Sequence, residues 1–239
     1  MKPHHQFVGG TSDAHPERCD RCDVDFSEHW KPIAIDLFCG KGGWTNALLE
    51  KGFTVYGFDI EPQPEYKGTF VQCDILTLTA DDLRTYGAIF ATCSSPCEQF
   101  SVHGMKHFHP NPPFPAMGIK LFNHARALLE ELGIPYVMEN VRPAKNFVGR
   151  ETNHCGPFYL WGPGVPAIFP PCAYKIQKGL MTKWIDSKGK TRTQGPQGRA
   201  GRLPGEGTVA ASRERTAQAA MIPLSIARAV ADVAERYIP

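Results

Sequence analysis

The sequence predicts an α/β fold: a doubly wound, mostly parallel sheet of the Rossmann-like type with helices on both faces. Short β-type runs alternate with helical patterns from residue 33 to residue 140. A glycine-rich turn follows the first run, and an acid or a cysteine stands near the end of each later run. Since parallel strands bring their carboxyl ends to one edge of a sheet, we expect these side chains to share one ligand cleft.

The strands and helices are assigned from the period of their apolar residues. The run "IAIDLF" is closed by the glycines of "CGKGG", which precede the helical pattern "WTNALLEKG". In "IKLFNHARALLEELG" the apolar residues recur at helical spacing, and Gly133 suits the end of that helix. Beyond Pro223 a last amphipathic helix is expected. The strands are predicted at 33–38, 53–60, 68–75, 87–93 and 134–140, and the first two helices at 44–52 and 119–133.

The composition indicates a globular protein, because 42% of the 239 residues are hydrophobic. No apolar run is long enough to cross a bilayer, and the first residues lack the apolar core of a secretory signal. The eight cysteines are not spaced like those of a small secreted disulfide scaffold. We therefore expect a cytoplasmic monomer with mostly reduced thiols and no membrane contact.

The glycine-rich turn and two acids indicate a nucleoside-bearing cofactor. Gly40 to Gly43 join a strand to a helix, where the backbone can approach a ligand closely. Asp59 ends the second strand, 19 residues beyond Gly40, and is placed to accept hydrogen bonds from ribose hydroxyls. Asp74 ends the third strand and could bond an adenine amino group while Ile75 packs on the ring. The alternatives are a plain tight turn and, for Asp74, a cap on the next helix.

Cys97 stands between a proline and an acid in the stretch "ATCSSPCEQFS", residues 91–101. It is either an incidental buried thiol in a tight corner or a thiol presented to react. At a strand end, backbone N–H groups can favour the reactive thiolate form.

Four motifs in register resemble the DNA cytosine-5 methyltransferase family: "DLFCGKGG", "CDI", "PCEQFS" and "MENV", with an acid after the second strand. The resemblance covers residues 33 to about 160. It implies the fold of S-adenosylmethionine-dependent methyltransferases, S-adenosyl-L-methionine as cofactor, and methylation of cytosine at C5 in DNA, as in restriction-modification systems and phages. The expected setting is the cytoplasm of a bacterium or a phage-infected host cell.

The resemblance also implies roles for individual residues. Cys97 is the expected nucleophile, which adds to cytosine C6 and activates C5 for methylation. Glu139 is expected to hydrogen-bond ring N3 and the exocyclic amine, and Asn140 to hold the Cys97 loop. In duplex DNA the target base must leave the stack. The cofactor is expected to contact Asp36, Phe38, Cys39, Gly40, Gly42, Gly43, Asp59, Ile60, Asp74, Ile75, Ser95 and Pro96.

Three departures from the family pattern leave alternatives open. Glu98 replaces the usual Gln after the cysteine, which would raise the pKa of the thiol unless Glu98 points away or pairs with a cation. No Gln-x-Arg-x-Arg stretch follows the Glu-Asn-Val motif, and the region for target recognition is short. The missing role could pass to Arg142, Arg150, Arg213 or Arg215. The alternative readings are the same chemistry on RNA or a free nucleotide, and an inactive nucleic-acid-binding homologue.

The domain organisation is predicted from changes in composition along the chain. We expect a polar tail at 1–31, a catalytic cofactor-binding domain at 32–172, a basic glycine-rich segment at 173–207, and C-terminal helices at 208–239 that return to the catalytic domain.

The basic segment is predicted to contact nucleic-acid phosphates, with a solvated linker as the alternative. Phosphate contacts do not read sequence, so we expect a short recognition motif or a single-stranded substrate. From Lys175 to Gly205 eight basic residues face the single acid Asp186, a local charge of +7. The basic residues are Lys175, Lys178, Lys183, Lys188, Lys190, Arg192, Arg199 and Arg202.

Cys19 and Cys22 have the spacing of metal ligands. A structural zinc would need two more ligands, and the alternative is an exposed pair in a polar tail. The further ligands would come from His15, His29, His154, Cys155 or Cys172.

Overall fold

The structure is a computed structural model that describes residues 7–8, 18–19, 31–169, 182–185, 191–194 and 221–239. Two small antiparallel pairs are formed by β1 (Phe7–Val8) with β2 (Arg18–Cys19), and by β10 (Thr182–Ile185) with β11 (Thr191–Gln194). No helix among the described residues is long and apolar enough to cross a membrane.

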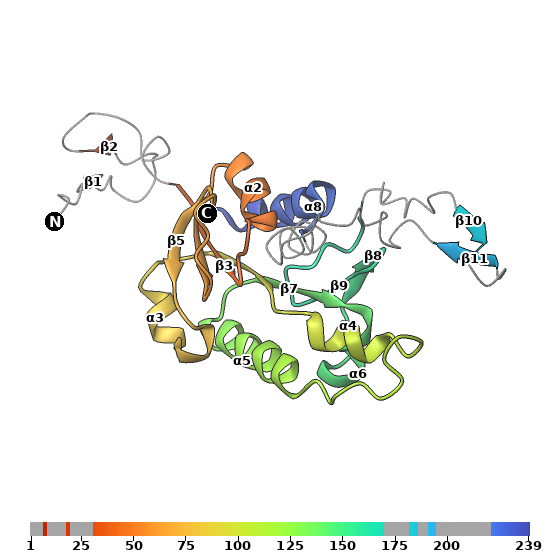
Figure 1. Cartoon of the computed structure of the whole chain (residues 1–239). Coiled ribbons are helices and arrows are strands. Elements are labelled where there is room, and N and C mark those ends of the chain that lie inside the picture. The colour runs from red at the N-terminus through yellow and green to blue at the C-terminus, as the bar shows by residue number, and fades with distance from the viewer. Residues whose placement is uncertain (1–6, 9–17, 20–30, 170–181, 186–190, 195–220) are drawn as a thin grey trace.

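The centre of the molecule is a seven-stranded sheet (Figure 1). Its five parallel strands are followed at one edge by an antiparallel hairpin. The chain winds outward from β3 through β4 to β5, then returns to place β6 on the other side of β3, so the predicted doubly wound sheet is confirmed. In spatial order the strands are β5 (Thr69–Gln72), β4 (Thr54–Asp59), β3 (Ile33–Leu37), β6 (Phe90–Ser94), β7 (Tyr136–Val141), β9 (Phe158–Trp161) and β8 (Asn153–Cys155).

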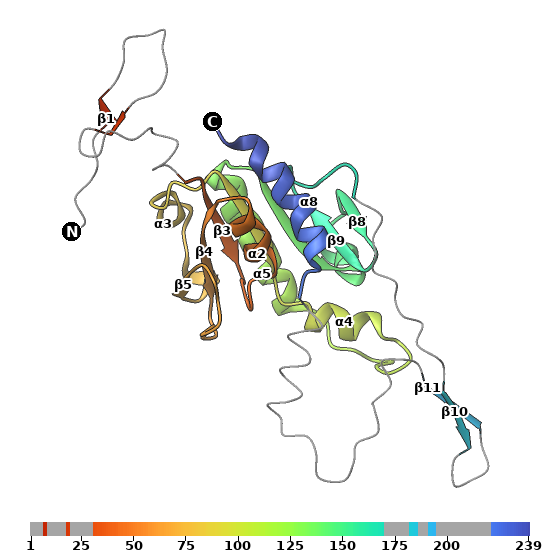
Figure 2. The same ribbon diagram turned by 90° about the horizontal axis from the view of Figure 1, so that it is seen from above.

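Helices cover both faces of the sheet (Figures 1 and 2). One face carries α2 (Gly43–Glu50) and α8 (Leu224–Ala234), which lie side by side. The other face carries the longer α5 with smaller helices around it. These are α3 (Ala80–Arg84), α4 (Glu98–Gly104), α5 (Ala116–Leu132) and α6 (Lys145–Val148), with the 3-10 turns η1 (Ile75–Thr77), η2 (Arg142–Ala144) and, after α8, η3 (Glu235–Tyr237).

Alternate residues of the central strand β3 pack into two separate hydrophobic cores. On β3, Ala34 packs in the cluster formed with α2 and α8, whereas Ile35 and Leu37 pack in the cluster that contains α5. Successive side chains of a strand point to opposite faces, so a strand covered on both sides is apolar throughout. Asp36 is the exception in this strand, and it is fully buried on the α2 face.

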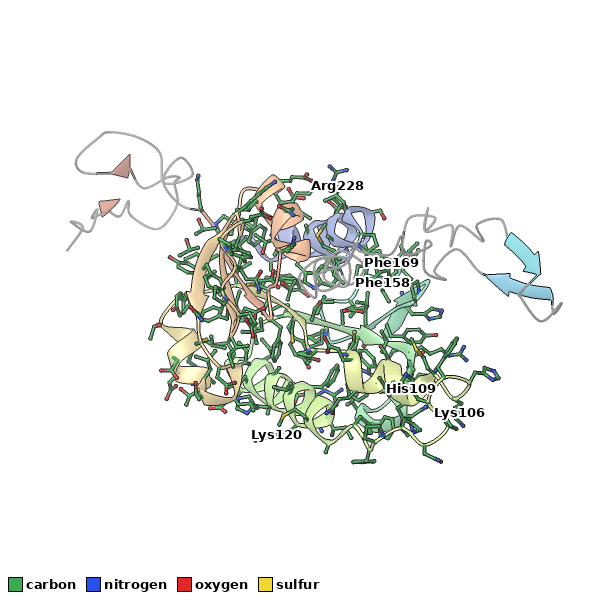
Figure 3. All side chains as sticks on the ribbon, in the orientation of Figure 1. Lys106, His109, Lys120, Phe158, Phe169 and Arg228 are labelled. Carbon is green, nitrogen blue, oxygen red and sulfur yellow. The ribbon has the colours of Figure 1, made fainter. Side chains whose placement is uncertain are left out.

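A glycine at the start of α2 lies close to the residues that lead into α8. A Cβ atom on Gly43 would lie 3.0 Å from the backbone nitrogen of Ile222, so a larger residue would make that segment shift slightly. Further along the two helices, the Arg228 Nε atom lies 2.7 Å from Glu50 Oε2. Figure 3 labels Arg228.

The structure adds elements that the sequence analysis did not predict, among them a hairpin and the helix that follows Cys97. The hairpin of β8 and β9 forms within "NHCGPFYLW", where Gly156 and Pro157 interrupt the apolar pattern. Helix α4 begins at Glu98, directly after Cys97, in a segment that is too short and polar to show a clear helical period. The predicted helix at 119–133 begins earlier, at Ala116, because Pro115 precedes it.

Candidate active site

A cavity of about 470 Å³ opens at the carboxyl ends of the parallel strands. Such edges, where the strand order reverses, are the usual ligand sites of doubly wound sheets. The cavity is lined by Phe38, Asp59, Ile60, Glu61, Asp74, Ile75, Leu76, Ser94, Ser95, Pro96, Cys97, Glu98, Met117, Leu121 and Glu139.

The glycine-rich turn after β3 shapes one end of the cavity. Its backbone takes positive φ angles at Phe38 (54°), Gly40 (46°) and Gly42 (79°). The Gly42 amide donates to the Cys39 carbonyl at 2.8 Å, which closes the turn. Glycine adopts such angles without strain, whereas Phe38 is held in a conformation that is uncommon for its type. The turn thereby presents the Phe38 side chain to the cavity.

Asp59, at the end of β4, is fixed by backbone donors. Its Oδ2 accepts from the Gly40 amide at 3.0 Å, and its Oδ1 accepts from the Glu61 amide at 3.0 Å. A carboxylate has about four acceptor sites, so both oxygens retain capacity for ligand hydroxyls. Ile60 beside it is 57% exposed and lines the cavity, where it could cover a flat ring.

Asp74 caps the η1 turn through its Oδ1, which accepts from the Leu76 amide at 2.9 Å. The sequence analysis gave a helix cap as the alternative role of Asp74, and this cap is present. The same side chain lines the cavity together with Ile75. Capping and ligand contact are compatible, because the cap occupies one of the two carboxyl oxygens.

Asp36 is not among the residues that line the cavity, and its contact with the cofactor stays a prediction. Its carboxyl accepts hydrogen bonds from Thr45 at 2.7 Å and from Thr92 at 3.0 Å. The Tyr66 hydroxyl lies 2.6 Å from that of Thr45 and extends the network. Burial raises the pKa of Asp36 to about 7. The alternation of side chains along β3 turns Asp36 toward α2.

Four other predicted cofactor contacts are likewise not among the residues that line the cavity, and they stay predictions. Their backbone shapes the turn, as shown above for the amides of the glycines, and the buried Cys39 packs beneath it. Burial raises the pKa of the Cys39 thiol well beyond its ordinary range. The four residues are Cys39, Gly40, Gly42 and Gly43.

Cys97 lines the cavity at the N-terminus of α4. Its carbonyl accepts from the Ser101 amide at 2.8 Å. The pKa of the thiol is raised by burial first, then by the carboxyls of Glu139 and Glu98. The Ser101 hydroxyl and the backbone act in the opposite direction but are outweighed. Without a ligand, Cys97 is therefore held mainly as the neutral thiol.

Glu139, on β7, faces the same cavity and is 9% exposed. Burial raises the pKa of this carboxyl to about 8, while a hydrogen bond from Ser94 opposes the rise. At neutral pH the side chain is consequently a neutral acid that can donate a hydrogen bond. Ser94 is its register partner on the neighbouring strand β6.

Asn140 is fully buried and ties β7 to the turn that carries Cys97. Its Nδ2 donates to both the carbonyl and the hydroxyl of Ser95, each at 3.0 Å. Its Oδ1 accepts from the Val141 amide at 2.9 Å. The side chain does not line the cavity, so its contribution is to position the turn.

The cavity is strongly acidic. Among the described residues, its lining includes the five carboxyls of Asp59, Glu61, Asp74, Glu98 and Glu139, and no Lys, Arg or His. Neither Arg142 nor Arg150 reaches it, and Arg213 and Arg215 lie outside the described residues. Such a lining favours a ligand that carries positive charge.

The sequence analysis missed several lining residues. Glu61 could have been found from its place two residues after Asp59, and Ser94 from its place at the end of a strand. Met117 and Leu121 lie on α5, where the sequence shows them only as part of an amphipathic pattern.

Two groups of predicted residues remain predictions. Lys183 and Arg192 fall on β10 and β11, whose side chains the structure does not describe. The other basic residues, Lys175, Lys178, Lys188, Lys190, Arg199 and Arg202, lie outside the described residues. Cys19 ends β2, with its side chain not described, and Cys22 lies outside the described part. Within that part no group of three metal-ligating side chains occurs, and Cys155 is disulfide-bonded.

Part of the chain is similar to known methyltransferases. The family described as FtsJ-like methyltransferase matches residues 21–103, which is less than half of the chain. A search of curated proteins finds no match. Among solved structures, the Entamoeba histolytica methyltransferase EhMeth is 20% identical, with a TM-score of 0.39 over 50% of this chain and 41% of its own. The S. pombe Dnmt2 methyltransferase is 20% identical, with a TM-score of 0.37 over 50% and 37%.

The similar region thus spans less than half of each of those proteins. The seven-stranded sheet and the family match together support a methyltransferase. The chain has the Rossmann-like fold of the S-adenosylmethionine-dependent methyltransferases.

Proposed function

We propose that this protein transfers a methyl group from S-adenosyl-L-methionine to C5 of cytosine in DNA, through a covalent adduct with Cys97. The observation that carries the proposal is the shared cavity: Cys97 and Glu139 line it at one end, and Asp59 lines it at the other. A nucleophile, a neutral acid and an acceptor for ribose hydroxyls are the groups that this reaction needs.

The residues present fit the cofactor. Asp59 retains acceptor capacity for ribose hydroxyls, and Asp74 and the apolar Ile60 are placed for an adenine ring. The carboxyls of the described lining suit a sulfonium cation, because opposite charges attract. When bound, S-adenosylmethionine supplies the methyl group as an electrophile.

The side chains of the chain perform the remaining chemistry. Cys97 releases its thiol proton to solvent, and its sulfur forms a bond to C6 of the base. The displaced electron density moves into the ring, where Glu139 donates a hydrogen bond to N3 and stabilises it. C5 thereby becomes a nucleophile and is methylated. Water then takes the C5 proton, and the electron pair of that C–H bond restores the double bond while the C6–sulfur bond breaks and releases the Cys97 thiolate.

Asn140 supports this chemistry by holding the turn that carries Cys97. Because it binds both the carbonyl and the hydroxyl of Ser95, the Ser95–Pro96–Cys97 turn is held against β7. The sulfur is therefore positioned before the base arrives, which reduces the entropy lost in reaching the reactive geometry.

Covalent trapping tests the proposal. Oligonucleotides that contain 5-fluorocytosine, offered as single-stranded DNA, duplex DNA and RNA, should form a stable adduct with the protein in the presence of cofactor. C5 then carries fluorine in place of the proton whose loss releases the enzyme. Cys97→Ser should abolish the adduct, whereas Cys73→Ser, at a free cysteine elsewhere on this sheet edge, should retain it.

The substrate arms separate the alternatives. An adduct with RNA alone would assign the chemistry to RNA. Cofactor binding without an adduct on any of the three substrates would refute the proposed reaction and favour an inactive nucleic-acid-binding protein.

A further inference from the structure

The loop that joins α4 to α5, residues 105–115, displays an aromatic ring among cations. The Phe108 side chain is 81% exposed. Lys106, His107 and His109 flank it and are exposed as well. Lys106 and His109 lie at the outer end of α4 (Figure 3). A single exposed phenylalanine is ordinary, but aromatic rings interleaved with cations form the surfaces on which proteins stack nucleic-acid bases.

The backbone of the loop holds Phe108 in place. The Met105 carbonyl accepts from the Phe108 amide at 3.0 Å and from the His109 amide at 2.8 Å, so Phe108 lies in a closed turn. Beyond this turn the sequence "PNPPFP" has four prolines, which restrict the backbone. A stiff loop loses little entropy when a ligand binds to it.

The loop is anchored on α6 at both ends. His103, just before the loop, and Phe114, near its end, both pack edge to face on Phe147. The ring centroids are 4.9 Å and 5.7 Å from that of Phe147, respectively. Helix α4 also contacts η2, which begins with the exposed Arg142. The loop therefore has a firm base, with a further cation beside it.

The charge of this region is opposite to that of the strands that precede it. Residues 31–98, which supply most of the described cavity lining, have nine Asp or Glu and five Lys or Arg. Residues 99–129 have no Asp or Glu, and they contain four histidines in addition to their Lys and Arg residues. These Lys and Arg residues are Lys106, Lys120 and Arg126.

The loop borders the cavity. Helix α4 begins at Glu98 and α5 contains Met117, and both of these residues line the cavity. The carboxyls of the described lining repel phosphate groups. A nucleic acid whose base enters the cavity must therefore keep its phosphates outside, and the cations of the loop stand at that boundary.

We propose that Phe108 and the cations around it form a binding surface for single-stranded DNA, on which an unpaired base stacks while Lys106 contacts a phosphate. This inference rests on the proposed function and deepens it, because it names the form of DNA that the site takes. In a single strand a base can turn its face to the protein at little cost, whereas pairing and stacking oppose this in a duplex. The surface belongs to the catalytic domain and is separate in sequence from the basic segment at 173–207.

An added tryptophan reports the stacking directly. The fluorescence of Phe108→Trp should fall when an oligo-dT strand of about 20 nucleotides is added, because the new indole takes the place of the stacking ring. A parallel titration of the wild type subtracts the four native tryptophans. Ile168→Trp is the matched control and should show no change. Ile168 is 85% exposed, but it adjoins Phe169, which packs in the α2–α8 cluster on the opposite face of the sheet.

The affinity for the same strand, measured by fluorescence anisotropy, is the second readout. Phe108→Ala should weaken binding about 10-fold, and Phe108→Tyr, which keeps a ring, should restore it. Lys106→Gln should lower the slope of log affinity against log salt concentration by about 0.7, since one phosphate contact is lost. Ile168→Ala should change neither the affinity nor the slope.

The inference is overturned if Phe108→Trp is not quenched, if Phe108→Ala binds the strand as tightly as the wild type, or if duplex DNA or RNA binds more tightly than the DNA strand. Strand binding that depends on Phe108, in a protein that forms no 5-fluorocytosine adduct, would support the surface and refute the proposed reaction. An adduct formed by Phe108→Ala with undiminished strand affinity would refute the surface alone. The two failures are therefore distinguishable.

Discussion

The two ends of the cavity hold their carboxyls in opposite ways. At the β3–β4 end, Asp59 accepts two backbone N–H groups and stands beside an exposed isoleucine. At the β6–β7 end, Glu139 is buried, and its pKa is raised to about 8. Asp59 is thus held as an acceptor by backbone donors, whereas burial favours the neutral form of Glu139.

The difference shows how one sheet edge can serve two chemical purposes. An ionised acid is suited to holding the hydroxyls of a cofactor, and a protonated acid is suited to a ring nitrogen with a lone pair. A carboxyl group can thus serve either purpose, depending on its surroundings. The three predictions below test that separation.

The largest effect is expected when the carboxylic acid at each end of the cavity is replaced by the corresponding amide. Asp59→Asn should weaken cofactor binding by about 10- to 100-fold, because the side chain loses charge and acceptor capacity. Glu139→Gln should change cofactor binding by less than about 3-fold but slow adduct formation by about 100-fold. Calorimetry measures the first effect and single-turnover trapping measures the second. Equal losses of cofactor affinity in both variants would contradict the division of the cavity.

A smaller effect concerns stability. The pKa of Glu139 is about 8 in the folded protein against an ordinary value of 4.5. Between these values the folded state holds a proton that the unfolded state has released, so the Glu139 contribution to the free energy of unfolding falls as pH rises. Glu139→Gln removes this loss and should be more stable than the wild type at pH 9 by about 2–4 kcal/mol.

Urea denaturation at pH 5 and pH 9 checks this prediction. The buried Asp36 titrates in both proteins, so its contribution cancels in the difference. If the two proteins lose stability in parallel over this range, Glu139 is not held neutral by burial.

The smallest effect is expected at the thiol. Glu98 is among the groups that raise the pKa of Cys97, after burial and Glu139. Glu98→Gln should therefore raise the rate at which iodoacetamide alkylates Cys97 at pH 7.5, by about 2- to 5-fold. Glu61→Gln is the matched control, since Glu61 lines the same cavity but does not shift the thiol. Mass spectrometry of the Cys97 peptide follows both rates, and identical rates in the two variants would contradict the assignment.

The fold could be predicted because β-type runs and helical patterns alternate along the chain, and the acids at the strand ends mark the ligand edge. The shared cavity of Cys97 and Glu139 was predictable for the same reason, since both stand at the ends of parallel strands. The hairpin of β8 and β9 was not, because a strand of three or four residues has too few residues to show a period.

Side-chain roles were harder to predict than positions. Asp36 lies in a motif that suggested a cofactor contact. Its hydrogen-bond partners are instead Thr45, nine positions further on in α2, and Thr92 on the neighbouring strand β6. The hydrogen bond from Trp44 to Ser94 joins residues 50 positions apart and becomes visible only when α2 has docked on the sheet. Such contacts are properties of the tertiary structure and leave no local pattern.

The packing of α8 on α2 has a consequence for biosynthesis. Glu50 and Arg228, which pair across these helices, are 178 positions apart. A ribosome therefore makes the helix that carries Trp44 long before it makes the helix that covers it. Until then one apolar flank of the nascent sheet stays open to chaperones and proteases, and a translation pause between these two segments would prolong that exposure.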